Sequence, residues 1–113
     1  MNNTKIKLNY DGVDYVLEYN KAAIKVIEKN GFDINSFLEK PMSNIDLAFQ
    51  GAFIKNHPKV SLTTIDEIFQ HCPNKQDLVG SLYTMISECY EALFNVEEGK
   101  DDSKNITWET VKM

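Results

Sequence analysis

The fold is decided by residues 7–32, which read KLNYDGVDYVLEYNKAAIKVIEKNGF. Apolar and polar side chains alternate on both sides of Asp11-Gly12, and this period of two is typical of β-strands. Asp-Gly is a hairpin turn signal because Gly adopts positive φ at little cost. We therefore predict a β-hairpin over residues 4–19 with one apolar face. An isolated hairpin is marginally stable in water, so helices must cover that face.

The hairpin is followed by a segment with helical periodicity. Asn20 is a suitable N-cap and Gly31 suits the left-handed position after a helix, which together predict a helix over residues 21–30. A short helical turn is expected over residues 34–38. Pro41 should end it, because Pro lacks an N–H and restricts the residue before it.

A broad apolar helix is predicted over residues 44–56. Ser43 and Asp46 resemble a capping box at its start, with a shorter acid than usual. Its apolar residues cover more than half of the helix surface, which indicates contacts on two sides.

Two further helices follow in the sequence. Thr64 and Glu67 form a capping box that predicts a short helix over residues 65–71. Apolar residues at spacings of three and four predict a long amphipathic helix over residues 75–95. The expected fold is therefore α+β, with an N-terminal β-hairpin packed on a small bundle of three main helices and one or two short ones.

The C-terminal part of the sequence differs in character from the rest. Residues 97–105, EEGKDDSKN, contain no apolar side chain and predict a solvated, flexible linker. We therefore expect one domain over residues 1–96, then a tail over residues 97–113 that carries the single Trp108. Ile106, Trp108 and Val111 predict a small edge strand, or alternatively an aromatic anchor for another chain.

Composition argues against nucleic-acid binding. The chain has 113 residues and a net charge of −5, and all 12 basic residues are Lys. Residues 1–59 hold eight Lys against seven acids (+1), whereas residues 60–113 hold four Lys against ten acids (−6). An acidic chain without Arg repels phosphate backbones and lacks the guanidinium fork that reads guanine, so we expect no nucleic-acid partner.

Membrane insertion is also unexpected. No consecutive apolar run exceeds three residues, and the first seven residues lack the apolar stretch of a signal peptide. We expect a cytosolic protein in which Cys72 and Cys89 are reduced thiols.

The residue types that carry chemistry show no catalytic or metal-binding spacing. His57, His71, Cys72 and Cys89 match no zinc-ligand pattern, and the five glycines form no phosphate-binding loop. Cys89 lies in the apolar stripe of the predicted long helix, where a thiol acts as a small hydrophobe. We expect a non-enzymatic protein without a metal ion or cofactor.

Two glycines fall inside predicted helices. Gly51 and Gly80 each cost about 1 kcal/mol relative to Ala in a helix interior. Tight packing in the core would offset that cost, and a contact within an assembly is the alternative.

The order of these elements resembles a family of small proteins. The hairpin that leads into Tyr19-Asn20, the stretch DLAFQGAFIKNH at residues 46–57 and the N-x-x-W pattern at residues 105–108 carry the likeness. They resemble the tail assembly chaperone-like proteins encoded in the tail-gene region of siphophages and prophages of Gram-positive bacteria. The resemblance covers nearly the whole chain.

The resemblance implies a protein that binds the phage tape-measure protein in the host bacterial cytoplasm. Such chaperones keep the helical tape-measure protein soluble and are displaced as tail-tube subunits polymerise around it. Because they act in many copies, self-association and contact with the major tail protein are further expectations. The alternative is a structural tail protein, a tail-completion or tube-associated component, that stays in the virion.

Four residues are candidates for partner binding. Phe49, Phe53 and Ile54 are chosen because the predicted helix over residues 44–56 carries more apolar surface than one core contact needs. That helix could instead be central and wholly buried. Trp108 is the fourth candidate, as an anchor at the end of the tail.

Overall fold

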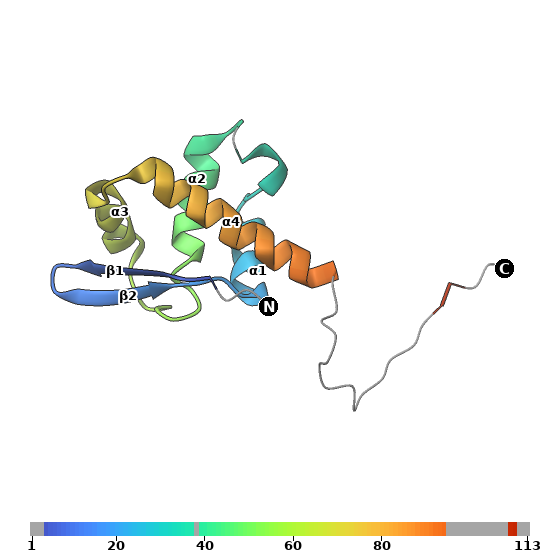
Figure 1. Cartoon of the computed structure of the whole chain (residues 1–113), viewed down its shortest axis with the longest axis horizontal. Helices are drawn as coiled ribbons and strands as arrows, with labels where there is room; N and C mark the ends of the chain where they lie inside the picture. Colours follow the sequence, from blue (N-terminus) through green and yellow to red (C-terminus); the bar gives the residue numbers. More distant parts are fainter. Residues whose placement is uncertain (1–3, 38, 95–108, 111–113) are drawn as a thin grey trace, which may run out of the picture.

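The computed structural model describes residues 4–37, 39–94 and 109–110. Within these residues the chain forms a two-stranded antiparallel hairpin, four α-helices and one short 3₁₀ helix (Figure 1). This is the predicted α+β fold, in which the helices lie on one side of the hairpin.

The predicted linker and the Trp108 segment lie outside the described residues. Only Glu109 and Thr110 of the tail are described, and both are exposed.

The hairpin forms where the alternation predicted it. Strand β1 (Ile6–Tyr10) pairs with β2 (Val13–Leu17) in antiparallel register. Asp11 and Gly12 both have positive φ, 55° and 80°, as a two-residue turn that matches the twist of the strands requires.

The outer edge of β2 is closed by the turn that follows the second helix. The Val16 N–H donates to Nε2 of His57 (2.9 Å), and the Asn56 side-chain amide donates to the Val16 carbonyl (3.1 Å). Two residues after Val16, just past the end of β2, the Glu18 N–H donates to the Ala52 carbonyl (3.1 Å). No further strand can pair along this edge without breaking these bonds.

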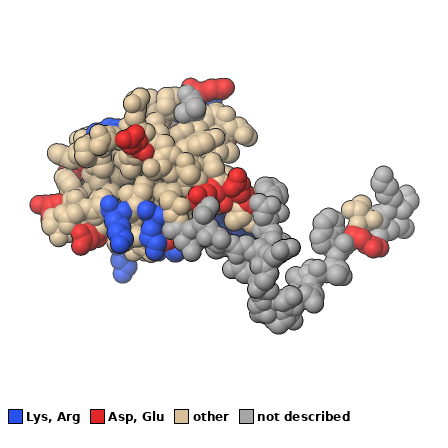
Figure 2. Space-filling model, viewed as in Figure 1, with Lys and Arg blue, Asp and Glu red and all other residues tan. Residues whose placement is uncertain are grey.

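None of the described residues covers the outer edge of β1 in this way. Lys7 and Asn9 lie opposite Val16 and Asp14 in the ladder, so their backbone groups face away from β2. Both side chains are exposed, and within the described residues their backbone groups bond to nothing at this edge. Lysine side chains gather over the hairpin side of the molecule (Figure 2).

Helix α1 (Lys21–Lys29) starts at the predicted residue and ends one residue before the predicted end, with Asn30 as its C-cap. The Asn20 side chain caps its first turn, and Gly31 has φ of 109°. The Phe32 N–H then donates to the Ile27 carbonyl (2.9 Å), which closes the helix end and buries the Phe32 ring. After it, the 3₁₀ helix η1 (Ile34–Ser36) forms within the predicted helical turn.

Helix α2 (Pro41–Gly51) differs from its prediction at both ends. The expected start with a Ser43 cap is wrong, because Pro41 occupies the first helical turn, where its missing N–H costs nothing and its φ is preset. The expected end at residue 56 is also wrong, since the chain turns at residues 52–56 to cover β2.

Helix α3 (Leu62–His71) begins three residues earlier than predicted. Ser61 is the N-cap, and its hydroxyl oxygen accepts from the Thr64 N–H (3.1 Å). The predicted capping box of Thr64 and Glu67 is therefore wrong, because an earlier Ser competes for the same role.

Helix α4 (Lys75–Phe94) matches the predicted long amphipathic helix and crosses the other helices (Figure 1). The largest buried side chains come from the hairpin, the four α-helices, and the turns after η1 and α2: Leu17, Ile27, Phe37, Phe49, Phe53, Ile68, Leu82 and Ile86. None of the described helices has both the length and the apolar character needed to cross a membrane.

Candidate functional site

The aromatic candidates on α2 and the turn after it lie in the core. Phe49 is 2% exposed and Phe53 is 1% exposed, and their rings contact each other edge to face with centroids 5.2 Å apart. Neither ring offers surface to a partner in this conformation. Ile54 is half-buried, and Trp108 lies outside the described residues.

The two helical glycines have different surroundings. A Cβ at Gly51 would lie 2.7 Å from Cγ2 of Ile27, so the explanation by tight core packing is confirmed there. A Cβ at Gly80 would meet nothing within 4 Å, and Gly80 is exposed. For Gly80 the explanation by core packing is wrong.

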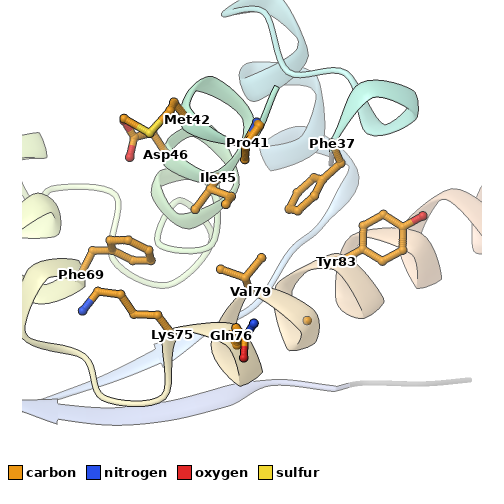
Figure 3. Close-up of a pocket in the computed structure, with 11 residues that line it drawn as sticks. Phe37, Pro41, Met42, Ile45, Asp46, Phe69, Lys75, Gln76, Val79 and Tyr83 are labelled. Carbon is orange, nitrogen blue, oxygen red and sulfur yellow. The ribbon is translucent and has the colours of Figure 1, made fainter. Parts of the chain in front are cut away.

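An open apolar groove runs between the start of α2, the end of α3 and the first half of α4 (Figure 3). We call it the α2–α4 groove, and its volume is about 680 Å³. It is lined by Phe37, Pro41, Met42, Ile45, Asp46, Phe69, Lys75, Gln76, Val79, Gly80 and Tyr83.

The floor of the groove is a packed aromatic cluster. Phe37 is 1% exposed, and its ring packs edge to face on Phe32 and Tyr83, with centroids 5.9 and 5.3 Å away. Ile45 from α2 and Val79 from α4 are half-buried and point into the space between the two helices (Figure 3).

The rim of the groove exposes large apolar side chains. Met42 is 85% exposed and Tyr83 is 41% exposed, one on each of the two helices that form the walls. An exposed apolar patch over a concave surface is typical of an interaction site. A methionine on such a surface adapts to partners of different shape.

The two charged side chains of the groove differ in their partners. The Lys75 ammonium donates to the carbonyls of Gln70 (3.1 Å) and Cys72 (2.8 Å), and lies 5.6 Å from the centroid of the Phe69 ring. The positive charge of Lys75 is thus stabilised by the carbonyl groups at the C-terminal end of α3. Asp46 makes no hydrogen bond or ion pair with any described residue, so it is the unpaired charge of the groove.

A buried amide holds the groove together. The Asn44 side chain is 2% exposed; its oxygen accepts from the Asp33 N–H (3.0 Å), and its NH₂ donates to the carbonyls of Ser36 (3.1 Å) and Lys40 (3.2 Å). These bonds fix the loop that carries Phe37. Sequence reasoning missed Asn44 because its partners are backbone groups, which leave no pattern in a sequence.

The model of a family described as "Domain of unknown function (DUF5055)" matches residues 1–111. This chain belongs to the DUF5055 family. No curated protein and no solved structure matches it.

The thiols of this DUF5055 protein are separate and protonated. Burial raises the pKa of both Cys72 and Cys89, so each remains a neutral thiol at physiological pH. Within the part of the chain that the structure describes, no three His, Cys, Asp or Glu side chains gather as metal ligands would. The described residues instead offer a shaped apolar surface, and the candidate functional site is the α2–α4 groove.

Proposed function

We propose that this DUF5055 protein is a phage tail assembly chaperone that binds the tape-measure protein in the host bacterial cytoplasm. The observation that carries the proposal is the α2–α4 groove, an open apolar surface on a small domain. The sequence likeness to tail assembly chaperone-like proteins supports the same function.

The groove has the chemistry that a helical client needs. A tape-measure protein outside the tail exposes apolar stripes along its helices, and such stripes aggregate in water. An amphipathic helix buries its stripe when it lies in an apolar groove between two helices. Met42 and Tyr83 on opposite walls would cover the sides of that helix, and the interaction needs no covalent chemistry.

Co-expression with overlapping fragments of the tape-measure protein tests the proposal. We expect the wild-type protein to retain at least one fragment on an affinity column and to keep it in the soluble fraction. Met42→Asp should reduce retention because it places a charge on the rim of the groove. Leu62→Asp is the matched control, since Leu62 is 61% exposed on α3 and does not line the groove.

Two results would contradict the proposal. The first is a wild-type protein that retains no fragment and rescues none from aggregation. The second is detection of this protein by mass spectrometry in purified virions, which would favour the structural tail protein. Shortening the chain after residue 96 tests the Trp108 anchor separately, because only that anchor predicts weaker retention.

A further inference from the structure

Gly80 is not required by the fold that contains it. It lies in the middle of α4 without a positive φ, and a Cβ there would meet no described atom within 4 Å apart from its own stretch of helix. Glycine weakens a helix interior relative to Ala, so its presence at an unconstrained position calls for another reason. Gly51 is the contrast, because Ile27 leaves no room for a side chain there.

The position of Gly80 supplies a reason. Gly80 lines the α2–α4 groove together with Gln76 and Tyr83, which lie one turn before and one turn after it on the same face of α4. Where α4 carries no side chain, its backbone forms part of the groove wall. The distance between two packed helix axes depends on the side chains at their crossing, and a glycine allows the closest approach.

The charge of the groove indicates which helix would be bound. The Lys75 ammonium already donates to the carbonyls at the end of α3, whereas the Asp46 carboxylate has no hydrogen-bond or ion-pair partner among the described residues. A carboxylate at the edge of an apolar groove favours a partner with a cationic side chain beside its apolar stripe.

We infer that the bound segment is an amphipathic helix that crosses α4 at Gly80 and places a lysine or arginine against Asp46. The inference rests on the proposed function and specifies the tape-measure segment: an apolar stripe flanked by a basic residue. A second copy of this chain is the competing occupant, and sedimentation of the wild type and of Gly80→Leu distinguishes it from the tape-measure segment.

The steric part is tested with the full-length protein and the tape-measure fragment that it retains. Gly80→Leu should weaken binding about tenfold or more, because the new side chain occupies the crossing point. The same variant should unfold at a higher temperature, because Leu is a better helix former than Gly. Ser81→Leu adds the same side chain to an exposed position of α4 outside the groove, and it should bind as the wild type does.

The outcomes separate the two proposals. Wild-type binding by Gly80→Leu overturns the crossing at Gly80 and leaves the chaperone function standing. Failure of the wild type to retain any fragment overturns the chaperone function. A wild-type dimer in sedimentation that Gly80→Leu dissociates assigns the groove to a second copy and overturns the inferred partner.

The charge part has its own test. Asp46→Lys should weaken binding of the fragment about two- to fivefold, with a smaller effect at high salt. Changing the basic residues beside the apolar stripe of the fragment to Glu should restore binding to Asp46→Lys and weaken it for the wild type. Equal affinities in all four combinations would overturn the proposed contact with Asp46.

Discussion

At the scale of single residues, a methyl group added to α2 or to α4 would meet very different surroundings. Gly51→Ala places a Cβ 2.7 Å from Ile27, which is itself buried and has little room to move. Overpacking outweighs the gain in helix propensity, so we expect a loss of about 1–2 kcal/mol in the free energy of unfolding. Urea denaturation measures it, and a variant as stable as the wild type would contradict the packing.

Gly80→Ala should have the opposite effect on stability. The added Cβ meets nothing within 4 Å, so only the helix propensity changes. We expect the free energy of unfolding to rise by about 0.5–1 kcal/mol. Calorimetry of the wild type and the variant tests this, and a lower unfolding temperature would show that the fold itself needs Gly80.

The Glu18 carboxylate gives the fold a sensitivity to acid. A hydrogen bond from Asn56 lowers its pKa below the usual 4.5; burial opposes that shift, and Lys55 and Lys5 add to it. Because the pKa is lower in the folded state, the stabilisation is present above the unfolded pKa and is lost as pH falls through the folded value.

Glu18→Gln tests this linkage. We expect the variant to be less stable than the wild type at neutral pH, with the difference shrinking in acid. Urea midpoints measured between about pH 3 and pH 6 should therefore converge as Glu18 becomes protonated. Parallel curves would show that Glu18 does not contribute to the acid dependence.

At the scale of elements, one side chain decides how the η1 loop sits on α2. Asn44→Asp replaces an NH₂ group that faces two carbonyls with an oxygen that repels them. We expect a loss of about 3 kcal/mol in the free energy of unfolding, measured in urea, and weaker fragment binding because Phe37 shifts. Asn35→Asp, on the exposed side of the same loop, should change either quantity little.

The elements differ in how far they could be predicted. The hairpin and α1 follow from local signals, because Asp11-Gly12, Asn20 and Gly31 each fix a backbone conformation without help from distant residues. The starts of α2 and α3 were missed because two adjacent signals competed, as Ser61 and Thr64 did, and a sequence does not rank them. Local signals locate an element better than its first residue.

The α2–α4 groove could not be predicted from periodicity. It brings residues 37–46 together with residues 69–83, which are far apart in the chain, and each of its half-buried residues has the pattern of an ordinary core position. Met42 gave no signal because an exposed methionine beside Pro41 looks like a loop residue. Gly80 did give a signal, a glycine inside a helix, but only the structure shows that its cause lies outside the core.

At the scale of the whole molecule, the fold should not need its tail. Every side chain of the buried apolar core in the described residues lies between Tyr15 and Ile86. A chain shortened after residue 96 should therefore keep its helical circular dichroism and its unfolding temperature. A clear drop in that temperature would show that residues 97–113 contribute to the stability of the domain.

The two edges of the hairpin also set a limit on how copies of this protein could join. Ala52, Asn56 and His57 bond to the backbone of Val16 and Glu18, so among the described residues the edge that stays open along its whole strand is that of β1. A sheet with two open edges can add further copies on both sides without limit. A sheet with one open edge can pair with one further copy, after which no open edge remains. Two copies that meet through β1 would close about a two-fold axis, so edge pairing ends at a pair and not at a fibre.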